Sequence, residues 1–187
     1  MQQAALFALV VKTINAGLQA QGIAGVTVQQ SFQPTQQGIP SQPMAAVFKV
    51  SDRRYGFLKR SDVWVPADPT ANPPTDGYMA HSESQWMEST FQVTCLVTQN
   101  PGVKRQLAAA DLADACANAL QSDAGRALLR EQGVGVLRVT DIRAPAFLDD
   151  RDRNEYAPNF DFTLTHENVR LSSSPIVENF DFNLQRV

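Results

Sequence analysis

The chain has 187 residues, a net charge of −3 and 19% charged residues. Its length suits one globular domain that needs neither a disulfide nor a metal to hold a core. The charge excludes the basic surplus typical of free-standing duplex-DNA binders and the high charge of disordered chains. No apolar run approaches the roughly 20 residues of a membrane span, so no membrane contact is expected.

The charges are unevenly distributed. No charged residue lies between Lys12 and Lys49, and residues 61–103 contain no Lys or Arg. A neutral polar tract can be brought against another protein without desolvating an ion. The simpler interpretation of such a tract is a solvated loop, and composition alone favours it.

The first third of the chain predicts a helix, a short strand and a long loop. Apolar residues recur at three- and four-residue spacing over residues 3–21, which predicts a helix that Gly22 ends. Val26 and Val28 alternate with polar residues, as in a short strand. Residues 31–43 are rich in Gln and Pro without periodicity, which predicts a loop or an extended arm.

A hairpin and a second long loop are predicted next. Residues 44–50 and 55–65 have strand character, and residues 51–54 between them are expected to form the turn. Residues 66–84 contain four prolines, which block helix and remove backbone donors. Loops of this length are unusual inside a domain and often serve interaction.

The second half of the chain predicts alternating strands and helices. Phe91, Val93 and Cys95 alternate with polar residues, Ser122 is suited to cap a short helix, and Gly133 to close it. The predicted elements are a strand, an Ala-rich helix, a shorter helix, a strand and a charged loop, over residues 86–98, 104–120, 123–132, 134–142 and 143–154.

The hexapeptide Asn-Phe-Asp-Phe-Thr-Leu of residues 159–164 recurs almost unchanged at residues 179–184. In each copy the Phe, Phe and Leu side chains point to one face. Two half-buried antiparallel strands joined by residues 165–175 explain this pattern. The predicted fold is therefore α+β: a mostly antiparallel β-sheet with an N-terminal helix and an Ala-rich helix pair packed on it. The whole chain, 1–187, is expected to form a single domain, with extended loops at about 31–43 and 66–84.

The sequence offers no catalytic constellation. It has no G-x-S-x-G motif, and its two histidines, His81 and His166, are expected at the surface. Cys95 and Cys116 lie on apolar faces of predicted elements, where they are expected to be buried free thiols and a thiolate is disfavoured. No catalytic residue is therefore predicted.

Metal and cofactor sites are not predicted either. Residues 150–154 resemble the start of a Ca²⁺ loop, but the loop glycine is missing and two arginines are interleaved. The Gly-Val-Gly of residues 133–135 precedes a strand, whereas a dinucleotide fingerprint follows one. We expect no cofactor-binding and no metal-binding residues.

One basic patch could contact nucleic acid. Its interpretations are DNA contact, a solvated turn, or arginine stems packed on a partner protein, and the acidic total disfavours the first. A neutral or acidic surface would suit a conduit through which DNA slides without sticking. The patch consists of Arg53, Arg54, Lys59 and Arg60, beside the aromatic residues Tyr55 and Phe57.

The order of the elements resembles a known family. An opening helix and a hairpin precede the strand Phe-Gln-Val-Thr-Cys-Leu-Val at 91–97 and an Ala-rich helix from Asp111. Arg-Asn-Glu-Tyr at 153–156, Asn-Phe-Asp-Phe at 159–162 and a strand beginning at Ile176 follow. This order resembles the tailed-bacteriophage neck proteins of the gateway or tail-terminator-like family.

The resemblance implies a structural virion protein of the phage neck, without enzymatic activity. Such proteins form a homo-oligomeric ring, commonly a hexamer, between the head-to-tail connector or collar and the tail tube and possibly the sheath. The ring terminates the tail and lines the channel through which double-stranded DNA passes without sequence-specific binding. The implied location is the virion, after assembly in the host cytoplasm. The two neutral loops would then contact neighbouring subunits or the neck.

Two alternatives stay open at the level of sequence. One is another connector, collar or baseplate component of a contractile machine. The other is a small enzyme of unknown class that uses Cys95 or His166.

Overall fold

The computed structural model describes residues 3–30, 42–70, 76–99, 106–148 and 154–175. The chain forms two compact units. Unit 1 comprises Met1–Tyr55 and Trp86–Glu167, and unit 2 comprises Gly56–Gln85 and Asn168–Val187. The predicted single domain therefore stays a prediction.

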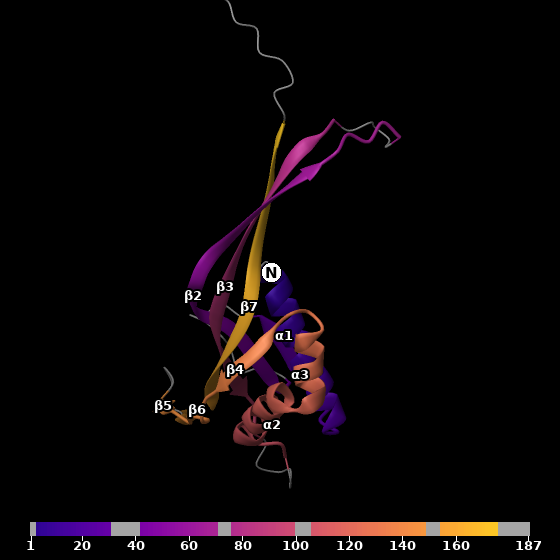
Figure 1. Cartoon of the computed structure of the whole chain (residues 1–187). Coiled ribbons are helices and arrows are strands. Elements are labelled where there is room, and N and C mark those ends of the chain that lie inside the picture. Colours follow the sequence, from indigo (N-terminus) through magenta and orange to yellow (C-terminus); the bar gives the residue numbers. More distant parts are fainter. Residues whose placement is uncertain (1–2, 31–41, 71–75, 100–105, 149–153, 176–187) are drawn as a thin grey trace, which may run out of the picture. The chain divides into compact units, whose positions relative to one another are not determined.

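The described residues contain helices in unit 1 and strands in both units. Three strands, β2, β3 and β7, contribute residues to both units (Figure 1). The elements in chain order are α1 Gln3–Ala20, β1 Thr27–Gln30, β2 Met44–Val65, β3 Tyr78–Leu96, α2 Ala109–Gln121, α3 Asp123–Arg130, β4 Gly135–Val139, β5 Ala146–Leu148, β6 Asn154–Tyr156 and β7 Asn159–Pro175.

The main sheet has five strands in the order β1-β2-β3-β7-β4, and β5 and β6 form a separate antiparallel pair. β1 pairs with β2 in parallel, whereas β4 pairs with β7 antiparallel. Contacts between β3 and β7 run in opposite senses, since Ser89 meets His166 and Gln92 meets Asp161. The predicted α+β fold with a mostly antiparallel sheet is confirmed.

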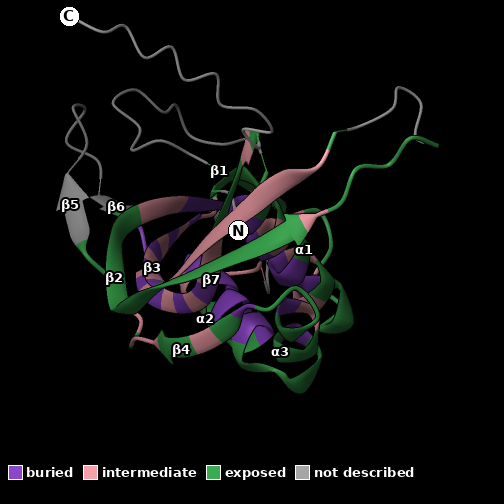
Figure 2. Ribbon diagram, turned by 45° about the horizontal axis from the view of Figure 1, so that its top comes forward, coloured by how far each residue is buried: buried purple, intermediate pink, exposed green. Residues whose placement is uncertain are grey.

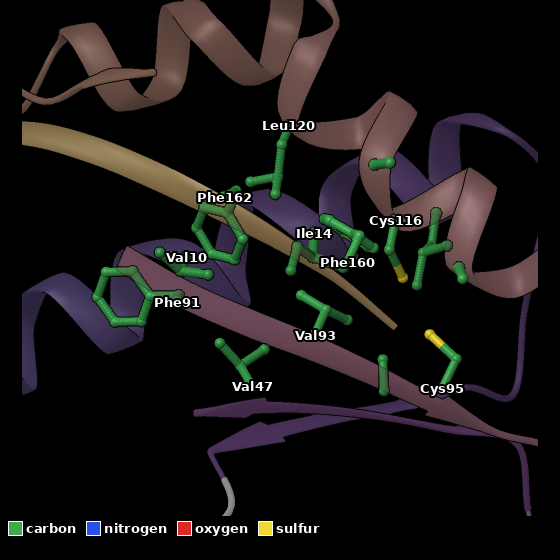
Figure 3. Packing of buried hydrophobic residues seen from close by; sticks show 14 of the residues in the cluster. Val10, Ile14, Val47, Phe91, Val93, Cys95, Cys116, Leu120, Phe160 and Phe162 are labelled. Carbon is green, nitrogen blue, oxygen red and sulfur yellow. The ribbon is translucent and has the colours of Figure 1, made fainter. Parts of the chain in front are cut away.

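The core of unit 1 lies between the sheet and the helices α1 and α2 (Figure 2, Figure 3). Phe91 of β3 stacks on Phe162 of β7 with ring centroids 5.3 Å apart, and the ring of Phe7 in α1 meets Phe91 edge-on at 5.2 Å. Ile14 of α1 and Leu120 of α2 enter the same cluster. One sheet face therefore carries the helices, as predicted.

The two helices approach closely at Gly17. A Cβ at this position would lie 2.2 Å from the Cβ and 2.8 Å from the Cα of Ala119 in α2. Helix α1 ends as predicted, with Gly22 at a positive φ of 74°. Absence of a side chain at Gly17 is thus what lets α1 lie against α2.

The helix pair is shorter at its start than predicted. Helix α2 begins at Ala109 rather than at residue 104, because Ala108 is extended (φ −86°, ψ 154°). Ser122 caps α3 as expected, and its Oγ accepts a hydrogen bond of 3.0 Å from the backbone N–H of Gly125.

The predicted hairpin of residues 44–50 and 55–65 is wrong. β2 runs without interruption from Met44 to Val65, and residues 51–54 are strand. Asp52 accepts a hydrogen bond from Ser89 of the neighbouring strand, which holds this polar segment in the sheet. The predicted loop 66–84 is also too long, since β3 begins at Tyr78. Residues 31–41 of the other predicted loop lie outside the described residues.

The C-terminal predictions need similar correction. Residues 165–175 are strand and not a linker, because β7 continues to Pro175. The predicted loop 143–154 contains β5 and the start of β6, and β4 is shorter than the predicted strand 134–142. The second copy of the hexapeptide, residues 179–184, and the loop residues 149–153 lie outside the described residues.

The regular structure described in unit 2 consists of parts of three strands: residues 56–65 of β2, 78–85 of β3 and 168–175 of β7. None of its described residues is buried. The strand pairings of β1 and β4 involve only residues of unit 1. Among the described residues, unit 2 therefore has neither a helix nor a hydrophobic core.

Substitution Gly17→Ala is expected to destabilise the protein. Alanine favours a helix by about 1 kcal/mol over glycine, but the new methyl group would clash with the backbone of Ala119, at a cost of about 1–3 kcal/mol. Chemical denaturation of the variant would measure the net loss. The double variant with Ala119→Gly should recover part of it, because one of the clashing methyl groups is removed. Equal or greater stability of Gly17→Ala alone would contradict the close helix contact.

Candidate functional site

The most developed polar cluster of unit 1 joins β2, β3 and β7. Ser89 Oγ donates a hydrogen bond of 2.6 Å to Asp52 Oδ1 and lies 3.0 Å from His166 Nε2. Lys49 forms an ion pair with the same aspartate. Ser89 is fully buried and His166 is 5% exposed. A serine, a histidine and an aspartate thus meet at hydrogen-bonding distance, the residue types of a hydrolytic triad.

The charge state of Asp52 decides where the protons lie. Partial burial by itself raises the pKa of Asp52, but the hydrogen bonds from Lys49 and Ser89 outweigh it, so the pKa is lowered below its usual value. Asp52 is therefore a carboxylate and an acceptor at neutral pH. The Ser89 hydroxyl proton points to Asp52, and His166 Nε2–H must donate to Ser89 Oγ.

This direction is the reverse of what nucleophilic catalysis needs. In a triad the histidine accepts the serine proton and the aspartate orients the histidine. Here the aspartate takes the serine hydrogen bond, and Nδ1 of His166 has no hydrogen-bond partner among the described residues. In this cluster His166 donates to Ser89, and Ser89 donates to the carboxylate of Asp52. These hydrogen bonds hold the strands β7, β3 and β2 together.

The sequence interpretation of His166 is wrong. It was expected at the surface just past a strand end, whereas it lies buried within β7. Phe160, Phe162 and Leu164 precede it at two-residue spacing and are buried on the same face. That alternation could have identified His166 as buried. Ser89 likewise precedes the buried Phe91 by two residues on β3, so it lies on the same face of the strand.

The two cysteines are buried free thiols, as predicted. Their sulfur atoms face each other in the core between β3 and α2 (Figure 3). The neighbouring thiol of Cys116 and burial both raise the pKa of Cys95 far above its ordinary value. A thiolate nucleophile is therefore disfavoured at Cys95.

The residues of the predicted basic patch are divided between the two units. Arg53 and Arg54 belong to unit 1, and Lys59 and Arg60 belong to unit 2. All four side chains are exposed, and they follow one another along the strand β2 rather than around a turn. Contact of Arg53, Arg54 and Arg60 with DNA and their contact with a partner protein both stay predictions.

Unit 2 carries a polar ladder across its three strands. His81 Nδ1 lies 2.7 Å from Asp62 Oδ1, and His81 Nε2 lies 2.8 Å from Ser174 Oγ. Arg60 Nε and Glu83 Oε1 form an ion pair of 3.0 Å. These groups are exposed or half-exposed, so each pair contributes little to stability. His81 lies in β3 and not in the predicted Pro-rich loop.

The described residues of unit 1 enclose at least two hollows. The first, of about 390 Å³, lies among α1, α2 and α3 and is lined by small uncharged residues such as Ala16, Gly17 and Ala119. The second, of about 350 Å³, is lined by Trp86, Arg126 and residues of the α3–β4 turn. The Ser89–His166 cluster lines neither hollow. Neither hollow therefore brings a ligand to that cluster.

The described residues contain no group of three or more His, Cys, Asp or Glu side chains that could hold a metal ion. Within the same residues, no helix has the length and apolar character needed to cross a membrane.

Comparison with known proteins identifies one family. The family described as E217 gateway protein gp29 matches residues 5–176. No curated protein sequence matches the chain. A similar solved structure is the sheath/tube terminator, in its extended state, of an extracellular contractile injection system called PVC. It is 13% identical with a TM-score of 0.40, and the match covers 96% of this chain and 63% of that chain. The chain thus spans less than two thirds of that protein's length.

Thiol labelling tests the burial of the cysteine pair. Because burial and the neighbouring thiol disfavour thiolate at Cys95, an aromatic disulfide reagent should modify neither Cys95 nor Cys116 in the native protein. Both should react once denaturant unfolds the chain. Rapid labelling of either thiol under native conditions would contradict the buried pair.

The stability of the protein should fall as the pH drops below about 6.5. Burial lowers the pKa of His166 from its usual 6.5, so the unfolded chain takes up a proton before the folded protein does. The contribution of neutral His166 is complete above pH 6.5 and is lost as the pH falls toward the lower folded pKa. For one group the slope cannot exceed about 1.4 kcal/mol per pH unit.

Denaturation curves of wild type and His166→Gln between neutral and mildly acidic pH would measure this slope. The variant should show a flatter dependence than wild type, because it lacks the buried histidine. An unchanged slope in His166→Gln would rule out the buried histidine as its source.

Proposed function

Because the chain belongs to the family of the E217 gateway protein gp29, which matches its residues 5–176, we propose that it is a structural protein of a tailed-phage neck. It forms a ring, of six copies by the resemblance, that joins the head connector or collar to the tail tube and sheath. The ring terminates the tail and lines the channel through which double-stranded DNA leaves the head. The protein acts in the virion after assembly in the host cytoplasm.

The match over most of the chain is the observation that carries this proposal. The geometry of the polar cluster supports a non-enzymatic role, because Ser89 donates to Asp52 and is not activated by His166. The net charge of −3 also suits a channel wall, since each added phosphate contact would increase affinity for passing DNA.

The alternative structural role is another connector or collar component, or a baseplate component, of a contractile machine. Electron microscopy separates the baseplate role from the neck role. Virions that carry a tagged copy of the protein should show the tag at the junction of head and tail. Phage lacking the protein should yield filled heads and unattached tails. A tag at the distal end of the tail, or normal joining of heads to tails without the protein, would contradict the neck role.

The remaining alternative, an enzyme that uses Cys95 or His166, is tested by phage viability. Phage with the conservative substitutions Cys95→Ser or His166→Gln should form plaques as wild type does, provided the variant proteins fold. Loss of plaques despite intact folding and virion assembly would favour an enzymatic role.

A further inference from the structure

Three polar side chains of unit 2 stand in the hydrogen-bond order of a serine nucleophile and its base. His81 of β3 lies between the other two residues. Its Nδ1 is 2.7 Å from Oδ1 of Asp62 on β2, and its Nε2 is 2.8 Å from Oγ of Ser174 on β7. Both distances are those of good hydrogen bonds. Aspartate on Nδ1 and serine on Nε2 is the order in which a histidine activates a serine.

The carboxylate of Asp62 fixes the tautomer of the histidine. A carboxylate only accepts hydrogen bonds, so Nδ1 of His81 carries the hydrogen of the first contact. In the neutral ring Nε2 is then an acceptor, and the hydroxyl of Ser174 donates to it. The Ser174 proton therefore already points to the base that would remove it. The buried Ser89 has the opposite arrangement, because its proton points to a carboxylate.

The three side chains can be reached from solvent. The side chains of Asp62 and His81 are 60% and 36% exposed, and Ser174 is half-buried. A small ester can therefore approach the Oγ atom of Ser174, whereas Ser89 is fully buried. Because water reaches the same groups, the activation of Ser174 is weaker than in a closed active site, where charges act at low dielectric.

An exposed aromatic ring lies on the same face of the sheet. Trp64 follows Asp62 by two residues on β2, so the two side chains point to the same side. The ring of Trp64 extends to the residue before β3, since a Cβ at Gly77 would meet it. Trp64 is 46% exposed. Because an exposed indole packs against flat apolar groups, this face favours an ester that carries an aromatic group.

We propose that Ser174 is an acylation site, at which the serine hydroxyl takes the acyl group of a reactive aryl ester. Nε2 of His81 accepts the hydroxyl proton while Oγ forms a bond to the carbonyl carbon. The bond from that carbon to the aryl oxygen breaks, the aryl oxide leaves with the electron pair, and His81 releases its proton to water. A water molecule can later attack the acyl-serine, which releases the carboxylic acid and restores the hydroxyl of Ser174.

An aryl ester suits this site because its leaving group departs as a stable anion and needs no proton from the protein. Asp62 does not touch the reacting atoms in this step. It is a positioning residue, which holds the tautomer of His81. The chemistry goes beyond the proposed function, and the neck role does not need it.

Acetylation by p-nitrophenyl acetate tests the proposal on the full-length protein. Peptide mapping by mass spectrometry at early times should find the acetyl group on Ser174. His81→Gln should lower the rate of this acetylation roughly tenfold or more, because the base is removed. Ser174→Ala should lower the release of p-nitrophenolate. The matched control is Ser173→Ala, which removes the hydroxyl of an exposed neighbour on the opposite face and should react like wild type.

Two comparisons separate activation from a merely structural contact. Asp62→Asn should slow the acetylation of Ser174, whereas Asp62→Glu should retain more of it, because only the latter keeps a carboxylate for Nδ1 of His81. Wild-type protein in denaturant should lose the reactivity of Ser174, because the contact with His81 is broken. Thermal unfolding should be similar in all variants, since each substituted side chain is exposed or half-exposed.

The proposal is overturned if the acetyl group is found on other residues while Ser174 stays unmodified. It is equally overturned if His81→Gln or the denatured chain acetylates Ser174 as fast as the native wild type. None of these results affects the neck role, which depends on where the tagged protein lies in virions.

Discussion

The stability of unit 1 depends on the contact between one face of the sheet and the helices α1 and α2. The ring of Phe91 touches Phe162 on the next strand and Phe7 on α1, so a single side chain ties the two layers together. Loss of such a ring from a core costs about 3–5 kcal/mol. Ser89 and His166 continue the strand faces of Phe91 and Phe162. The packing that buries the aromatic rings therefore also buries Ser89 and His166 and disfavours a charged His166.

The helical cover is confined to unit 1, but the strands beneath it are not. β2 has 22 residues and β3 has 19, far more than the five or six of an ordinary strand. Both strands extend into unit 2, where none of the described residues is buried. Successive side chains of these segments point to opposite sides of the sheet. One side carries the ion pairs and the other is nearly uncharged, and neither side is buried.

Local patterns in the sequence predicted the elements that depend on local spacing. Helix α1 follows from its apolar period, and the start of α3 follows from the cap at Ser122. The failure at residues 51–54 has a different cause. A polar run between apolar segments resembles a turn, but it contains neither Gly nor Pro, and Asp52 is held by Ser89, 37 residues away. No local pattern contains that contact, so the continuous strand β2 could not be deduced from it.

The polar cluster, too, was predictable from the sequence only in part. The burial of His166 was available from the two-residue period of β7, but the direction of its hydrogen bond was not. That direction depends on the carboxylate of Asp52, which Lys49 and Ser89 keep ionised from two different strands. The charge of Asp52 is thus compensated within the chain, by the ion pair with Lys49 and by the hydrogen bond from the buried Ser89. This compensation is the physical reason to assign cohesion of the three strands to the polar cluster of unit 1.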